Sequence, residues 1–289
     1  MLRTIFNYLE PLYRPPSEGN SLIFQVSLGC PNNTCHFCKM YKARKYHIRP
    51  LKEIKDEISY AGTHFSDTRR VFLADGDVMA MPYDMLCEIL ECLNKKFPQL
   101  TRVGVYANGS SLLRKSNHEL KQLKELKLGI CYMGLESGSQ AILDDMNKKE
   151  SVSDMIAAAE RVNNIGIKLS VMILLGLGGK PQTHLHARAT TEALNQMQPT
   201  FLSALTVTPE PKTRLFSRVE KGEFDILTTS ESMSELKEII SGLSLSATVF
   251  RSNHVSNRFP LAGRFPRDKQ HLLDEIDYIL KAIQSLGIS

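Results

Sequence analysis

Three cysteines lie close together near the start of this chain, in the segment Cys30-Pro-Asn-Asn-Thr-Cys35-His-Phe-Cys38. Thiolate sulfur is a soft ligand that selects zinc, copper(I) or iron–sulfur clusters. Three thiols do not complete a tetrahedral zinc site, although His36 or His47 could supply a fourth ligand. An iron–sulfur cluster held by the three cysteines alone would leave one iron without a protein ligand. The spacing favours such a cluster and leaves a zinc site or no metal as alternatives.

The cysteines follow the first of several runs that are typical of strands. The predicted strands are Leu22–Leu28, Arg70–Ala74, Arg102–Ala107, Leu128–Leu135, Ile167–Leu175 and Phe201–Val207. Amphipathic runs between and after them predict helices. Their apolar stripes are Leu51/Ile54/Ile58/Ala61, Leu86/Ile89/Leu90/Leu93, Leu120/Leu123 behind a Ser116/Glu119 capping box, Met155/Ala158/Ala159/Val162 before Gly166, a stretch over His184–Met197, and Met233/Leu236/Ile240/Leu243. Six strand–helix units in series predict an α/β fold with a parallel sheet.

Because the candidate ligands follow the first strand, we expect an open partial (β/α)6 barrel of the TIM type. The strands' carboxyl ends would then face one mouth. The sequence predicts three parts. Residues 1–20, with three prolines, form an irregular N-terminal extension, and residues 21–245 form the barrel core. Residues 246–289 form a long polar loop over 246–268 and a last helix through Leu273, Ile276, Leu280 and Ile283, packed on the core.

The bulk properties of the chain narrow the class of protein. A hydrophobic content of 42% in 289 residues supplies a full core. Six cysteines in a chain of this length do not resemble a secreted disulfide scaffold. Neither a signal peptide nor a membrane-spanning apolar run is evident. We therefore expect a soluble, cytoplasmic protein that does not bind membranes. The net charge of +5 is mild, so we do not expect a nucleic-acid partner.

The triad, with the aromatic Phe37 before its last cysteine, resembles the signature of the radical S-adenosylmethionine (radical SAM) enzymes. The usual spacing in that family has three residues between the first two cysteines, whereas this chain has four. The resemblance implies that Cys30, Cys35 and Cys38 bind a 4Fe–4S cluster. It also implies that SAM chelates the open iron and is cleaved reductively, so that hydrogen abstraction from a substrate begins.

Further segments extend the resemblance over roughly residues 20–245. The turn Ala74–Asp77 stands where the family holds the amino group of SAM, although it departs from the commoner Gly-Gly-Glu. Met133–Ser139 contains Gly-Leu-Glu-Ser-Gly, similar to the elongator-like and methylthiotransferase-like subgroup, and Met146-Asn147-Lys148 follows. The glycines of Leu174–Gly179 stand where the family lines its SAM pocket. The implied cofactor-binding residues are Phe37, Asp75, Gly76, Asp77, Glu136, Ser137 and Lys148.

Plainer interpretations of these residues remain open. Asp75 and Asp77 are also ordinary turn residues, Glu136 could be a strand-end carboxylate, and Lys148 a surface lysine. An iron–sulfur electron-transfer or sensor protein and a zinc-stabilised binding module are the rival functions. Cys87, Cys92 and Cys131 are interpreted as ordinary buried thiols. The sequence does not identify the substrate or the final reaction.

Two polar segments are candidates for contacts with other molecules. The basic run after the triad consists of Lys39, Lys42, Arg44, Lys45, His47 and Arg49. It is interpreted as a solvated loop, or alternatively as a docking site for an acidic electron donor such as flavodoxin or ferredoxin. The loop around residues 250–258 is the candidate substrate-binding segment, with Arg251 and His254 suited to an anionic or carbonyl-bearing substrate.

Overall fold

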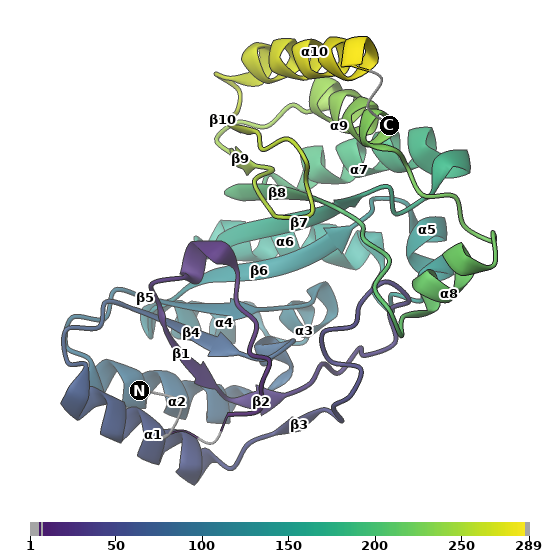
Figure 1. Cartoon of the computed structure of the whole chain (residues 1–289). Helices are drawn as coiled ribbons and strands as arrows, with labels where there is room; N and C mark the ends of the chain where they lie inside the picture. The colour runs from purple at the N-terminus through teal and green to yellow at the C-terminus, as the bar shows by residue number, and fades with distance from the viewer. Residues whose placement is uncertain (1–5, 7, 287–289) are drawn as a thin grey trace. The chain divides into compact units, whose positions relative to one another are not determined.

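The computed structural model describes residue 6 and residues 8–286. Eight strands form one sheet in the order β1-β4-β5-β6-β7-β8-β9-β10 (Figure 1). They are β1 Leu22–Gln25, β4 Arg70–Ala74, β5 Arg102–Tyr106, β6 Leu128–Glu136, β7 Lys168–Leu175, β8 Phe201–Thr206, β9 Val249–Arg251 and β10 Ala262–Arg264. The recorded pairs are parallel except for β9 with β10. This mostly parallel sheet confirms the predicted α/β class and is typical of a partial barrel.

The helices alternate with these strands. They are α1 Leu51–His64, α2 Tyr83–Lys96, α3 Gly109–Leu113, α4 Asn117–Glu125, α5 Gln140–Asp145, α6 Val152–Ile165, α7 Thr183–Met197, α8 Arg214–Glu220, α9 Thr229–Gly242 and α10 Lys269–Leu286. The predicted apolar stripes are the buried faces of these helices, as in α2. At α4 the capping box is complete, because Ser116 accepts from Glu119 N–H and the Glu119 carboxylate accepts from Ser116 N–H.

The described residues divide into two compact units. The first comprises the described residues up to Asn33, with Met40–Met133 and Arg161–Lys168. In it α1 packs against α2 and against β1, and the side chains of Phe24, Phe72 and Phe97 are fully buried. The second comprises Thr34–Lys39, Gly134–Glu160 and the described residues from Leu169 on. In it α7 packs against α9, and α9 packs against α10 (Figure 1). Each unit therefore has its own buried apolar residues.

Three details differ from the sequence-based expectation. The predicted first strand is divided, because β1 pairs with β4 while β2 (Ser27–Leu28) pairs antiparallel with β3 (His47–Ile48). The predicted loop 246–268 contains β9 and β10, which add to the six predicted strands. These strands have only three residues each, too few for a readable alternation. In α10 the buried leucine is Leu272, and Leu273 is only partly buried.

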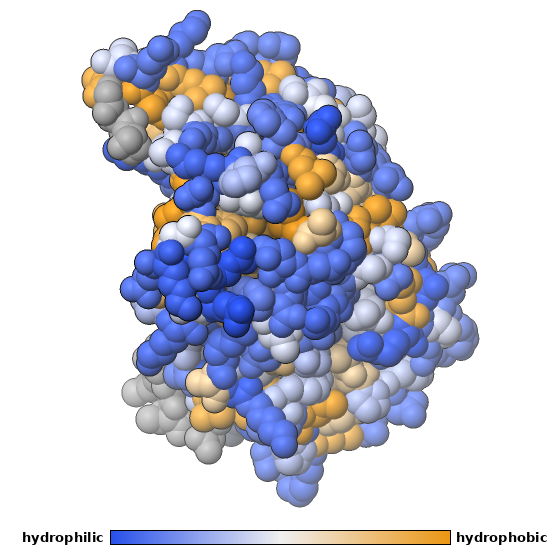
Figure 2. Space-filling view, turned by 90° about the vertical axis from the view of Figure 1, so that its right-hand side faces the viewer, coloured by the Kyte–Doolittle hydropathy of each residue, from blue (hydrophilic) through white to orange (hydrophobic). Residues whose placement is uncertain are grey.

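The division into 1–20, 21–245 and 246–289 remains a prediction about domains. Residues 1–5, 7 and 287–289 of its first and last parts lie outside the described residues. In the described part of the chain, no helix combines the length and apolarity needed to cross a bilayer. Figure 2 shows one face on which hydrophilic residues predominate and hydrophobic residues gather in several separate groups.

Candidate functional site

In the first unit, the turn after β4 lies directly against Cys30. Gly76 N–H donates to the Gly29 carbonyl at 3.1 Å, and Gly29 N–H donates to Asp75 Oδ2 at 3.2 Å. A Cβ at Gly76 would stand 2.7 Å from Cys30 Cβ and 2.9 Å from the Gly29 oxygen. Only glycine fits this approach, since real Cβ atoms do not come so close to backbone. The structure thus brings together Cys30, Asp75 and Gly76, which the sequence singled out separately.

Asp75 is fully buried and only partly satisfied. Besides Gly29, its Oδ2 accepts from Gln25 Nε2 at 3.2 Å and pairs with Arg44 at 3.5 Å. Among the described residues, Asp75 Oδ1 accepts no well-aligned hydrogen bond, although hydrogen bonding from Tyr41 helps to lower the pKa of Asp75. Burial raises the pKa of Asp75, and these partners counteract the rise. A buried oxygen in this condition favours a further donor or a proton.

Asp77 joins the turn to the start of α3. Its Oδ2 accepts from Asn108 Nδ2 at 3.0 Å, and its Oδ1 accepts from Ser111 Oγ at 2.8 Å. Nearby, the buried Tyr46 hydroxyl makes no hydrogen bond within the described residues. Burial, with smaller contributions from Asp77 and Cys30, raises the pKa of Tyr46 to about 12. Neither Tyr46 nor Asn108 was expected from the sequence, because no motif marks them.

In the second unit, the residues around Cys35 are held by the turn that follows α5. His36 N–H donates to the Met146 carbonyl at 2.8 Å, and His36 Nδ1 lies 2.9 Å from the Asp145 carbonyl. Thr34 and Asn147 exchange two hydrogen bonds of 3.2 Å. The His36 carbonyl accepts from Leu215 N–H at 3.0 Å. Because its neighbours on either side are fixed in this way, Cys35 has a defined place in the backbone.

Phe37 packs half-buried against an apolar cluster within the same unit. The buried members of this cluster are Ile142, Met146, Leu177, Val207, Leu215 and Phe224. Cys38 N–H donates to the Cys35 carbonyl at 3.4 Å, which closes a tight turn across Phe37. The aromatic ring therefore anchors the turn between Cys35 and Cys38 to α5, α8 and the segments that follow β7 and β8.

The Gly-Leu-Glu-Ser-Gly segment at the end of β6 is explained by close packing. A Cβ at Gly134 would stand 2.0 Å from Glu136 Oε1, so the Glu136 carboxylate lies directly over Gly134. A Cβ at Gly138 would stand 2.1 Å from the Ala189 oxygen of α7. Glu136 Oε1 lies 3.6 Å from Lys148 Nζ. Burial raises the pKa of Glu136, and Lys148 counteracts the rise.

Ser137 belongs to a buried polar network that joins β6, α7 and α9. Its Oγ lies 2.8 Å from His186 Nδ1, and His186 Nε2 lies 3.8 Å from Glu235 Oε1. Glu235 accepts from Gly176 N–H at 2.6 Å and from the Thr183 hydroxyl. Burial lowers the pKa of His186 to about 4 and raises that of Glu235 to about 7, so burial favours the neutral form of each. His186 and Glu235 were not singled out in the sequence.

The remaining predicted residues have mixed surroundings. Cys131 is buried, which raises its pKa to about 12, whereas Cys87 and Cys92 are only partly buried. Arg251 donates to the carbonyl of its neighbour Phe250 at 2.7 Å, and His254 Nδ1 lies 2.9 Å from Ser256 Oγ. The substrate role of Arg251 and His254 stays a prediction.

The basic run is partly used inside the first unit. Arg49 is buried and pairs with Glu57 at 2.6 Å, and Arg44 pairs with Asp75. Lys42 donates to the Asn33 carbonyl at 3.0 Å and is exposed, as is Lys45. The run is therefore not one continuous solvated patch.

The three triad thiols are all half-buried. Within the residues that the structure describes, no group of three or more His, Cys, Asp or Glu side chains is arranged to hold a metal ion. The donor set nonetheless suits an iron–sulfur cluster, since three thiolates occur in nine positions. The unsatisfied Asp75 oxygen and the space left by Gly76 beside Cys30 suit a polar cofactor.

Comparison with known proteins agrees with these features. The heme chaperone HemW of Bacillus subtilis (strain 168) is 25% identical over 218 residues, which is 71% of this chain and 55% of that protein. The threonylcarbamoyladenosine tRNA methylthiotransferase MtaB of Thermotoga maritima is 24% identical over 206 residues, 68% of this chain and 46% of that protein. Coproporphyrinogen III oxidase (HemN) from Escherichia coli has a similar fold, with a TM-score of 0.57, 14% identity, and coverage of 76% of this chain and 51% of that chain.

The chain thus spans about half the length of these relatives. The family model of the radical SAM superfamily matches residues 24–187, which is more than half of the chain and includes all three triad cysteines. The chain belongs to the radical SAM superfamily.

Proposed function

We propose that this chain is a radical SAM enzyme that cleaves SAM reductively and starts hydrogen abstraction from a substrate not yet identified. The observation that carries the proposal is the Cys30-Cys35-Cys38 triad inside the segment that matches the superfamily. In this assignment the three thiolates hold a 4Fe–4S cluster. The cluster and SAM together supply a one-electron cleavage of the sulfonium carbon–sulfur bond.

The chain's own residues contribute position and polarity. Gly76 leaves room beside Cys30, and Asp75 offers a buried oxygen that suits the ammonium group of SAM. Phe37 anchors the turn between Cys35 and Cys38 in an apolar cluster, which also keeps water from that side of the turn. Asp77 is assigned to the same polar pocket, although Asn108 and Ser111 bond both of its oxygens.

Glu136, Ser137 and Lys148 are the SAM-binding candidates of the second unit. Lys148 already offsets the charge of Glu136. A carboxylate of SAM would therefore compete with Glu136 for this ammonium group, and the proton that burial favours on Glu136 would release it. Ser137 is held by His186 and sets the backbone that follows Glu136.

The Gly-Leu-Glu-Ser-Gly segment supports membership of the elongator-like and methylthiotransferase-like subgroup as a finer proposal. The matched relatives carry different names, a heme chaperone and a tRNA methylthiotransferase, so they do not select one substrate for this chain. We assign reduction to a small acidic donor such as flavodoxin or ferredoxin.

The test is anaerobic reconstitution with iron and sulfide, followed by SAM and dithionite, with chromatography of 5′-deoxyadenosine. Wild-type protein should form the nucleoside, and Cys30→Ala, Cys35→Ala and Cys38→Ala should each reduce it to the level without protein. Cys87→Ala, a half-buried thiol on α2, is the matched control and should keep wild-type formation. An intact cluster that yields no nucleoside would defeat the proposal, as would full activity in the triad variants.

A further inference from the structure

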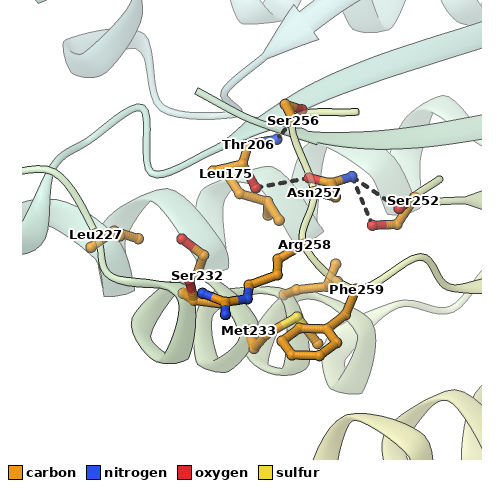
Figure 3. A pocket seen from close by; sticks show the side chains of 12 residues that line it. Leu175, Thr206, Leu227, Ser232, Met233, Ser252, Ser256, Asn257, Arg258 and Phe259 are labelled. Atoms are coloured by element: carbon orange, nitrogen blue, oxygen red, sulfur yellow. Dashed lines mark hydrogen bonds between the residues drawn. The ribbon is translucent and has the colours of Figure 1, made fainter. Parts of the chain in front are cut away.

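A small pocket in the second unit opens beside the carboxyl ends of β7 and β8. It has a volume of about 100 Å³ and lies between these strand ends, α9 and the segment between β9 and β10. Leu175 and Thr206 contribute the strand ends, and Met233 and Phe259 contribute apolar walls (Figure 3). A pocket of this size accommodates a group of a few carbon atoms, since a cavity of about 150 Å³ holds benzene.

The lining of the pocket contains one charge, and it is positive. Arg258 lines the pocket, and no Asp or Glu does so. Figure 3 shows its side chain extending across the pocket toward α9. Within residues 6 and 8–286, the Arg258 guanidinium group forms no ion pair and no hydrogen bond. The adjacent Asn257, in contrast, is fully used, bonding Thr206, Ser252 and the Ala204 carbonyl.

A second polar group in the pocket lacks a partner. Ser232, on α9, lines the pocket and is only 5% exposed. Its hydroxyl is buried and makes no hydrogen bond within the described part of the chain. Leaving such a group unsatisfied is unfavourable, so buried hydroxyls are normally paired. The loop fixed by Asn257 thus presents the Arg258 guanidinium group, and α9 presents the buried Ser232 hydroxyl, to the same pocket.

We propose that this pocket binds the carboxylate of a small ligand with an apolar body. The planar guanidinium fork matches two carboxylate oxygens, and the Ser232 hydroxyl can donate to one of them. The single cation matches a charge of −1, whereas a phosphate dianion would lack a second cation. Met233, Phe259 and Leu175 would contact the apolar body. The claim that this pocket is the substrate site rests on the proposed radical SAM function. The claim that it binds a carboxylate does not depend on that function.

The experiment uses the reconstituted full chain without reductant, and 3-methylbutanoate as the probe. Binding is followed by ligand-observed saturation-transfer NMR. The neutral isostere 3-methylbutanamide and inorganic phosphate are the comparison ligands. The carboxylate should bind at least about tenfold more tightly than either, since a charge-assisted bidentate pair is worth about that factor. Equal binding of the amide, or tighter binding of phosphate, would overturn the proposal.

Variants locate the site. Arg258→Gln should weaken carboxylate binding about tenfold and leave amide binding unchanged, and Ser232→Ala should weaken carboxylate binding about threefold. Arg264→Gln changes an exposed arginine on β10 that does not line the pocket, and this variant should bind like wild type. Wild-type binding by Arg258→Gln would refute the site. Carboxylate binding without 5′-deoxyadenosine formation would refute only the radical function, and the reverse would refute only the pocket.

Discussion

The turn after β4 shows how single residues shape the surroundings of Cys30. Asp75 and Gly76 each bond the backbone of Gly29, one residue before the thiol. The family motif predicted both residues in the turn. Their bonds to Gly29 could not be predicted, because they depend on the register of β1 against β4. Tyr46 was missed for the same reason: its place beside Asp77 and Cys30 is purely tertiary.

Gly76→Ala should disturb the cluster site without unfolding the chain. The new Cβ would overlap Cys30 Cβ and the Gly29 oxygen, so the loop must shift, at a cost of roughly 1–3 kcal/mol. Iron bound per chain after reconstitution should fall to about half or less of the wild-type content. Gly222→Ala, in the loop after α8, is the control: its Cβ would meet nothing within 4 Å, so it adds only the backbone strain of an alanine at φ +70°. Equal iron content in Gly76→Ala and Gly222→Ala would contradict the role given to Gly76.

At the scale of elements, the sequence predicted the helices and main strands well. The apolar run Arg70–Ala74 is β4 itself, and the capping box marks the start of α4. Such signals are local, so one chain segment contains them completely. The short strands β9 and β10 carry no such signal and form because β8 offers a free edge to Val249–Arg251. The network of Ser137, His186 and Glu235 was also unpredictable, since it joins segments about 50 residues apart.

That network predicts a pH dependence of stability. Burial raises the pKa of Glu235 to about 7, above its ordinary value of 4.5, so the folded state binds this proton more tightly than the unfolded state. Wild-type stability is therefore lost progressively as the pH rises from about 4.5 to about 7. Glu235→Gln removes this loss. Its free energy of unfolding, relative to wild type, should increase by about 3 kcal/mol between pH 4.5 and pH 8.

Urea unfolding of the two proteins across this pH range measures the difference. His186 is present in both, so its own titration, with a pKa lowered to about 4, largely cancels in the comparison. Thr183→Val is a useful companion, since it removes a hydrogen bond to Glu235 but keeps the carboxyl group. A difference between Glu235→Gln and wild type that stays constant with pH would show that Glu235 does not titrate in this window.

At the scale of the whole molecule, the mild charge of +5 leaves room for an acidic electron donor. Arg44 and Arg49 pair inside the first unit and Lys39 pairs with Glu210, so the docking hypothesis is tested on the exposed Lys42 and Lys45. The double variant Lys42→Glu/Lys45→Glu should slow flavodoxin-driven 5′-deoxyadenosine formation about tenfold at low salt. Dithionite-driven formation should change little, since dithionite needs no docking surface.

Lys121→Glu/Lys281→Glu changes the net charge by the same amount on α4 and α10 and is the matched control. It should retain most of the flavodoxin-driven rate. If both double variants slow flavodoxin equally, net charge rather than a docking site is responsible. If Lys42→Glu/Lys45→Glu slows dithionite as much as flavodoxin, the change acts on the cluster itself.

The central claim is that this chain holds a cluster with one iron open to SAM. Electron paramagnetic resonance of the reduced, reconstituted protein tests it most directly, because binding of SAM to that iron changes its ligands. The spectrum of the reduced 4Fe–4S cluster should change on addition of SAM in the wild type. Cys35→Ala, which removes one of the three thiolates, should show no such cluster signal. A wild-type cluster spectrum that is identical with and without SAM would contradict the account.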